Sequence, residues 1–240
     1  MPQTTRIPLI DLARTAALLG MVAFHFSYDL LMFGLIPYNY AYTPTFYYHA
    51  RIVAGTFLLL SGLGLWLSHG AGIRWPAFWR RFAKIAGAAA LVSVATRIAM
   101  PEFYVYFGIL HAIALYSLLG LLALRLPAIV TAALAAVFVY GSYHWHTEAL
   151  NAPLLRFVGL ALDPATTMDF EPIFPWFGAV LAGIALGKLG SQTGLWARLV
   201  GKPTGKWVQI ASWPGQHSLL IYLIHQPILM GLVWLYSQLA

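Results

Sequence analysis

The sequence contains no cysteine in 240 residues, and only 9% of its residues are charged. The absence of cysteine excludes disulfide bonds and thiol nucleophiles. Soluble globular domains have about 25% charged residues, and this chain has no polar stretch long enough to form such a domain. Apolar residues make up 60% of the chain, so the composition is that of a membrane protein. The simplest organisation is one membrane domain over residues 1–240.

The sequence also lacks the motifs with which soluble folds bind nucleotides and catalytic zinc. It contains no Gly-x-x-x-x-Gly-Lys-Ser/Thr loop, no Gly-x-Gly-x-x-Gly turn and no His-Glu-x-x-His pair. The formal net charge is +7, but the basic residues lie in short loops between apolar segments. That pattern is typical of membrane topology and not of nucleic-acid binding. We therefore expect a lipid bilayer as partner, no nucleic acid, and no metal.

Seven apolar segments are long enough to cross a bilayer, which takes about 20 residues per crossing. We predict an all-α fold, a polytopic membrane bundle of about seven transmembrane helices. Glycines such as Gly178, Gly183 and Gly187 predict close contact between helices. The connection 145–173 is predicted to be a lid or a short surface helix, and 190–214 to lie on the inner surface. The predicted helices are 8–35, 46–68, 77–99, 103–125, 127–145, 174–190 and 216–238.

The distribution of charge predicts which ends of the helices face the cytoplasm. With the N-terminus inside, the acidic residues outside the first segment fall in outer loops, and most basic residues fall in inner ones. An odd number of crossings then places the C-terminus outside. The basic residues assigned to the inner side are Arg6, Arg74, Arg80, Arg81, Lys84, Arg125, Lys188, Arg198, Lys202 and Lys206.

The first segment carries four ionisable residues on one side of a helix. Arg14 and His25 are eleven residues apart, and Asp11 and Asp29 are eighteen apart, which at about 3.6 residues per turn brings all four onto one stripe. Ionisable groups within a bilayer are costly and face a protein interior or a polar cavity. Alternatively, Asp11 and Arg14 form an i,i+3 ion pair at the start of the helix.

Helix rise predicts which polar groups lie at the same depth in the membrane. His25, Asp29, Arg51 and His111 fall in the outer half, where they could converge in one cavity. His225 on the last helix lies nearer the middle. Glu102 lies at the mouth of the fourth helix. Each histidine taken alone could also be a core residue bonded to a nearby backbone group.

These residues resemble a known family. Asp11-Leu-Ala-Arg14, followed by ten residues and His25, is similar to the Arg-x10-His signature of the type-3 membrane acyltransferases. The segment IDLARTAALLGMVAFHFSYDL resembles more closely the small bacterial relatives of the catalytic domain of heparan-α-glucosaminide N-acetyltransferase. Similar segments are FYYHARIVAGTFLLLSG (46–62), YFGILHAIALYSLLG (106–120) and LLIYLIHQPIL (219–229).

The resemblance implies transfer of an acyl group, usually acetyl, from cytosolic acetyl-CoA to an acceptor on the outer face. The acceptor would be an envelope sugar or glycolipid, and the location the cytoplasmic (inner) membrane of a bacterium. In the type-3 membrane acyltransferases, the histidine matching His25 is taken as catalytic and the arginine matching Arg14 as a donor-site residue. Relatives with more helices also imply a possible homo-oligomer.

Elementary chemistry assigns matching roles to these residues. Histidine titrates in the range that a general base requires, so His25 is the predicted base and Asp29, one turn away, orients its ring. Arg51 or His111 could stabilise an oxyanion, and Arg14 with inner-loop bases could hold the phosphates of CoA. We predict His25 and Asp29 as catalytic.

Two other functions remain open at this stage. A transporter or flippase of a small polar or lipid-linked solute also needs charged groups within the membrane, although the chain has no internal repeat. A haem protein needs two histidines at one depth on facing helices, which His25 and His111 could provide.

Overall fold

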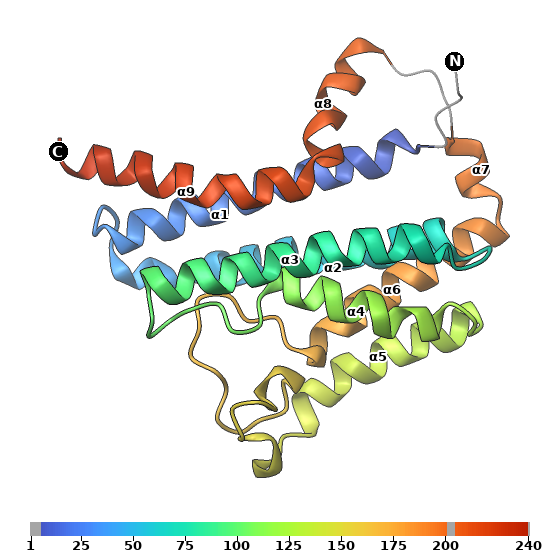
Figure 1. The fold of residues 1–240 in the computed structure, drawn as a ribbon, viewed down its shortest axis with the longest axis horizontal. Helices are drawn as coiled ribbons and strands as arrows, with labels where there is room; N and C mark the ends of the chain where they lie inside the picture. The colour runs from blue at the N-terminus through green and yellow to red at the C-terminus, as the bar shows by residue number, and fades with distance from the viewer. Residues whose placement is uncertain (1–5, 201–204, 240) are drawn as a thin grey trace. The chain divides into compact units, whose positions relative to one another are not determined.

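The computed structural model describes residues 6–200 and 205–239 (Figure 1). Lys202, assigned above to an inner loop, lies outside the described residues. Helices dominate the described part of the chain, and within it there is no β-strand beyond two isolated bridges. The predicted all-α class is therefore confirmed.

Among the described residues, five helices are long and apolar enough to cross a membrane. These helices carry exposed large apolar side chains, such as Leu19 at 66% and Ile98 at 78%, which suits contact with lipid. These five helices are α1 (Pro8–Met32), α2 (Pro44–His69), α3 (Trp75–Ala99), α6 (Ile173–Gln192) and α9 (Ser218–Ser237).

The other two predicted membrane segments form shorter apolar helices. α4 (Ile109–Ala123) has 15 residues and α5 (Ala128–His144) has 17. At about 1.5 Å per residue they reach roughly 22 and 26 Å, less than the hydrocarbon core of about 30 Å. Seven crossings therefore remain a prediction.

The fourth segment begins six residues later than predicted. We expected a helix from residue 103, but α4 begins at Ile109. The intervening residues pair instead with the connection between α5 and α6, because Phe103 O and Phe107 O accept the amides of Met168 and Glu171, each at 3.0 Å. Backbone groups that bond across to another segment are not available for a helix.

The chain forms two compact units, and the boundary between them falls within α2. We call residues 1–57 with 195–240 the terminal unit, and residues 58–194 the central unit.

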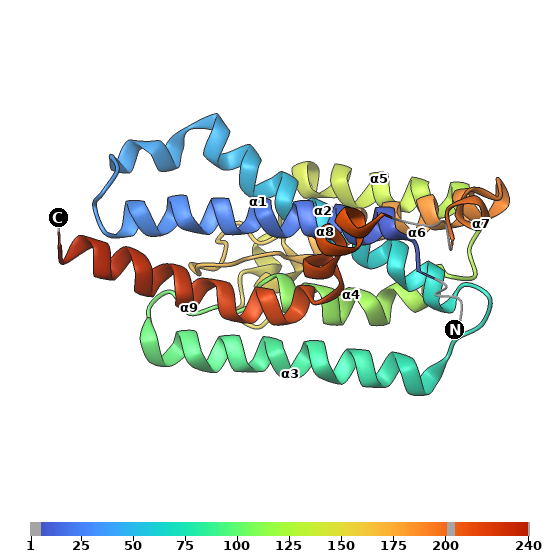
Figure 2. The same ribbon diagram turned by 90° about the horizontal axis from the view of Figure 1, so that it is seen from above.

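In the terminal unit, α1 packs against α8 (Lys206–Gln216) and α9. α1 and α9 lie side by side and run in the same direction, as Figure 1 and Figure 2 both show. α1 begins with Pro8, whose missing amide hydrogen costs nothing at the first helical position. Short helices complete this unit: a 3-10 turn (Tyr38–Tyr42) and α7 (Leu195–Leu199).

In the central unit, glycines allow α2 and α6 to touch through their backbones. A Cβ atom on Gly62 would lie 2.0 Å from the carbonyl oxygen of Val180, and one on Gly183 would lie 2.0 Å from that of Leu59. No larger residue fits at these positions without moving a helix. The prediction of close helix contact at Gly183 is confirmed.

Lys188, which was assigned to the inner side and falls within the predicted helix 174–190, lies in α6 with only 3% of its surface exposed. Its ammonium group donates to the carbonyl oxygens of Ala123 and Leu126 at 2.6 and 2.5 Å, and to the Thr131 hydroxyl at 2.9 Å. Helix C-terminal carbonyls carry partial negative charge and lack partners within the helix. Lys188 therefore joins α6 to the turn between α4 and α5.

The connection between α5 and α6 is neither a free lid nor a regular surface helix. It contains two 3-10 turns, Glu148–Leu150 and Arg156–Val158. The Asp169 carboxylate accepts the Ile109 amide at 2.9 Å, which caps the start of α4. Burial raises the pKa of Asp169 to about 6. The Asp169 side chain thus ties the connection to the start of α4, within the central unit.

Candidate functional site

The polar stripe predicted on α1 is largely its buried face. Asp11, Leu18, Met21 and Asp29 are all less than 7% exposed. The stripe carries two separate polar clusters, one in the first two turns of α1 and one in the last two. Arg14 and His25 are eleven residues apart, which corresponds to about 16 Å along the helix.

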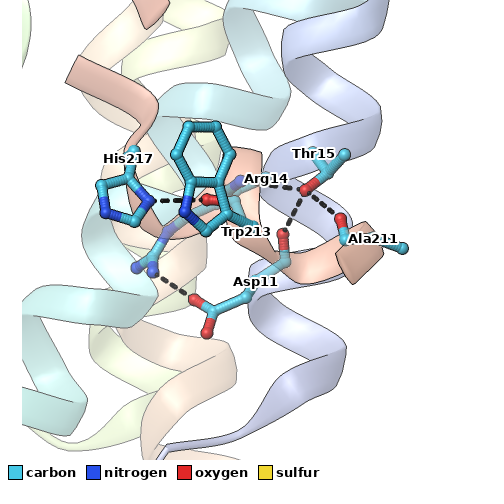
Figure 3. A network of polar contacts seen from close by, with 7 residues as sticks. Asp11, Arg14, Thr15, Ala211, Trp213 and His217 are labelled. Carbon is cyan, nitrogen blue, oxygen red and sulfur yellow. Dashed lines mark hydrogen bonds and ion pairs between the residues drawn. The ribbon is translucent and has the colours of Figure 1, made fainter. Parts of the chain in front are cut away.

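The first cluster joins the start of α1 to α8 (Figure 3). Arg14 Nη1 donates to Asp11 Oδ1 at 3.1 Å, so the i,i+3 ion pair considered above is formed. The Arg14 side chain is 31% exposed. Its guanidinium group therefore remains accessible to a ligand while Asp11 orients it.

Thr15 fastens α8 to α1 through its hydroxyl group. Thr15 Oγ1 donates to the Ala211 carbonyl at 2.8 Å and accepts the Gly215 amide at 2.9 Å. That carbonyl and amide are four residues apart, and an uninterrupted helix would bond them to each other. The hydroxyl thus inserts into α8 next to Pro214, and α8 is held beside Arg14.

An aromatic pair lies at the end of α8, near this cluster. The Trp213 and His217 rings stack with their centroids 4.5 Å apart, and His217 Nδ1 donates to the Trp213 carbonyl at 2.9 Å. Trp213 is 54% exposed. Figure 3 shows the pair and Arg14 in the same region. An accessible flat ring beside a guanidinium group suits a ligand that combines an aromatic base with phosphate.

The second cluster joins the last turns of α1 to α9. The His25 and His225 rings touch edge to face, with centroids 4.9 Å apart and an interplanar angle of 62°. Asp29 Oδ1, one turn further along α1, accepts the side-chain amide of Gln226 at 2.7 Å. We call His25, Asp29, His225 and Gln226 the paired-histidine cluster.

The paired-histidine cluster holds buried polar atoms with unused bonding capacity. Asp29 is fully buried and His225 is 7% exposed. Asp29 Oδ2, His225 Nε2 and Gln226 Oε1 have no hydrogen-bond partner in the described part of the chain. A buried polar atom without a partner costs about 1–3 kcal/mol. Three such atoms in one cluster call for an explanation, and a bound ligand that donates to them is one.

The other residues predicted for the terminal unit lie at the start of α2. Arg51 is exposed, and its guanidinium group lies 4.5 Å from the centroid of the Tyr47 ring. His49 Nε2 donates to the Gly20 carbonyl at 2.9 Å and thereby ties α2 to α1. This contact gives His49 a structural role.

His111 and Glu102 belong to the central unit. Glu102 lies exposed in the turn before α4. His111 lies in the first turn of α4, with Nε2 3.1 Å from Ser93 Oγ, whose hydroxyl hydrogen goes to the Val105 carbonyl at 2.7 Å. His111 Nε2 therefore donates to Ser93, and the opposite nitrogen, Nδ1, is buried without a partner among the described residues.

Gln226 and Thr15 were not among the predicted site residues. Neither is charged, so neither stands out by the electrostatic cost that marks intramembrane acids and bases. A weaker signal existed for Gln226, because the pair His225-Gln226 interrupts an otherwise apolar segment. Thr15 gave no such signal, because its role depends on a partner about 200 residues away.

The fold and the paired-histidine cluster define a polytopic membrane protein with ionisable groups buried between its helices. The sequence model of the family described as "Heparan-alpha-glucosaminide N-acetyltransferase, catalytic" matches residues 6–227. The chain belongs to this family, and the resemblance stated above is confirmed. Membership indicates an acetyltransferase-like membrane protein. No curated protein and no solved structure matches the chain.

Proposed function

We propose that this protein transfers an acyl group from a CoA thioester to a hydroxyl or amino group of an envelope sugar or glycolipid. The paired-histidine cluster is the proposed site of the chemistry. The observation that carries this proposal is the set of three partnerless polar atoms, buried beside two histidine rings in contact. Family membership supports acetyl-CoA as the donor.

The proposed reaction needs little more than a base and a place for the acceptor. The acceptor nitrogen or oxygen attacks the thioester carbonyl and loses its proton to an imidazole. The tetrahedral intermediate collapses, the carbon–sulfur bond breaks, and the CoA thiolate takes up that proton. A positioned general base contributes about 10²–10⁴-fold to such a step, and His25 with His225 supplies two imidazoles at the site.

The cluster at the start of α1 is the proposed donor site. Arg14 would bind a phosphate of CoA, because guanidinium groups suit phosphate geometry. Trp213 provides an exposed ring for the adenine, and α8 is fixed beside Arg14 by Thr15. The roughly 16 Å between Arg14 and His25 along α1 is the distance that the pantetheine arm of CoA would span.

The proposed orientation follows from charge. The N-terminal end of α1, with Arg14, faces the cytoplasm, where acetyl-CoA is made, and His25 with Asp29 lies in the outer half of the bacterial inner membrane. The basic residues gathered near the proposed inner ends of the helices support this orientation.

Sealed vesicles that contain the purified protein test this proposal. Radiolabelled acetyl-CoA is supplied on one face and glucosamine, or a lipid-linked sugar, on the other, and products are identified by mass spectrometry. We expect an acetylated sugar from the wild type and none from Asp29→Asn. Glu148→Gln, at an exposed position outside the clusters, is the matched control and should keep full activity.

The same experiment separates acyl transfer from transport. A transporter or flippase would move the sugar across the vesicle membrane without changing its mass. Movement of unmodified sugar that depends on Asp29, with no acetylated product, would refute acyl transfer and favour the transport function.

A further inference from the structure

Two of the three partnerless atoms of the paired-histidine cluster are oxygen atoms that can accept hydrogen bonds. Gln226 Oε1 is an amide oxygen that only accepts hydrogen bonds, and Asp29 Oδ2 only accepts when the carboxylate is ionised. The third atom, His225 Nε2, either donates or accepts, depending on which ring nitrogen carries the hydrogen. Its state decides what kind of ligand the cluster can bind.

The backbone of α9 fixes the tautomer of His225. Its Nδ1 lies 2.6 Å from the Tyr222 carbonyl oxygen, and a carbonyl can only accept. Nδ1 therefore carries the hydrogen in the neutral ring, and Nε2 presents a lone pair. A histidine whose second nitrogen is held in this way is oriented as in catalytic triads, where a carboxylate plays the same part.

The orientation of Gln226 is fixed in the same manner. Its Nε2 lies 2.7 Å from Asp29 Oδ1, which accepts, so the amide nitrogen faces the carboxylate and Oε1 is left over. With Asp29 ionised, all three atoms are acceptors, on side chains of the same cluster. A ligand that satisfies them must bring several N–H or O–H donors.

His225 differs from His25 in ways that favour it as the base. His225 is 7% exposed, its tautomer is set, and it is followed directly by Gln226, which binds Asp29. His25 is half-buried and meets the His225 ring edge to face. His25 therefore packs the ring of His225 in place.

We propose that His225 Nε2 accepts the proton of the attacking group, while Asp29 Oδ2 and Gln226 Oε1 hold the substrate through its other donor hydrogens. The assignment rests on the proposed acyl transfer and moves the base from His25 to His225. The new bond joins the acceptor nitrogen or oxygen to the acyl carbon, and the carbon–sulfur bond breaks. The proton passes from the acceptor to His225 and then to the CoA thiolate. The substrate class is a polyol or amino sugar, not a simple alcohol.

Kinetics of matched variants test the assignment. His225→Ala should lower kcat at least 100-fold, in the range of lost general bases, with less than a threefold change in acceptor KM. Added imidazole should restore part of this activity. His25→Ala should lose less than tenfold and gain nothing from imidazole. Near-normal turnover in His225→Ala, or rescue only in His25→Ala, would overturn the proposal.

A measurement that needs no turnover separates this inference from the proposed function. In protein with ¹⁵N-labelled histidine, NMR should show His225 with the hydrogen on Nδ1 and a bare Nε2, and glucosamine should shift the Nε2 signal. A hydrogen on Nε2, or a signal that glucosamine leaves unchanged, would refute the role of His225. If wild-type protein acetylates no acceptor, the proposed function fails, yet the NMR result still decides whether His225 Nε2 receives a donor from the sugar.

Discussion

The Lys188→Met substitution removes an ammonium group that donates three hydrogen bonds inside the central unit. The methionine fills a similar volume but leaves the carbonyls of Ala123 and Leu126 without a donor. Each such buried acceptor costs about 1–3 kcal/mol. The two carbonyls together account for about 2–6 kcal/mol. Relief of the buried charge offsets only part of this, because three hydrogen bonds already compensate the ammonium group. We expect a net loss of about 2–4 kcal/mol.

Thermal unfolding in detergent, followed by circular dichroism, measures this effect. A loss of that size corresponds to a fall in Tm of roughly 10 °C for a chain of this length. Lys84→Met is the matched control, because Lys84 is exposed on α3 and surface changes usually stay within about 0.5 kcal/mol. An unchanged or higher Tm for Lys188→Met would refute the idea that Lys188 holds α6 to the turn between α4 and α5.

Three further predictions follow from the other contacts. The fold favours protonated Asp169, so its contribution to stability is full below about pH 4 and is lost as pH rises through about 6. The Tm of the wild type should therefore fall between pH 4.5 and 7, and Asp169→Asn should flatten this fall; an unaltered pH profile of Tm in the variant would contradict the role of Asp169. Gly215→Ala should loosen α8, because its Cβ would lie 2.0 Å from the Asp11 carbonyl oxygen; faster hydrogen exchange across residues 206–216 is expected, and wild-type exchange would contradict the packing. Arg14→Ala should raise the KM for acetyl-CoA about tenfold, the loss of one charge-assisted contact, and leave the acceptor KM unchanged; the reverse pattern would remove Arg14 from the donor site.

The sequence predicted the helices well where an apolar run decided the structure. α1 and α2 begin within two residues of their predicted starts, and the polar stripe of α1 followed from helical periodicity alone. The start of α4 was predicted wrongly because residues 103–108 are apolar enough to continue a helix. Their backbone bonds to residues 168–171 decide otherwise, and composition does not record such pairing.

The candidate site was only partly predictable, because it depends on which helices meet. Asp29 was expected to orient His25, yet its carboxylate bonds Gln226 on α9. The burial of Lys188 was not predicted, because a single charge near the end of an apolar run is equally compatible with an exposed helix end and with a buried contact to another turn. Charges are conspicuous in an apolar sequence, but their partners are set by packing between segments far apart in the chain.

The most direct test of the central claim is the mass of the product formed by purified protein in lipid nanodiscs, where both faces are accessible. With acetyl-CoA and an amino sugar or polyol, we predict a product heavier by one acetyl group and an equal amount of free CoA. Both should disappear in the double variant Asp29→Asn/His225→Ala and persist in Glu148→Gln. Release of CoA without an acetylated product, or equal product from the double variant, would contradict acyl transfer at the paired-histidine cluster.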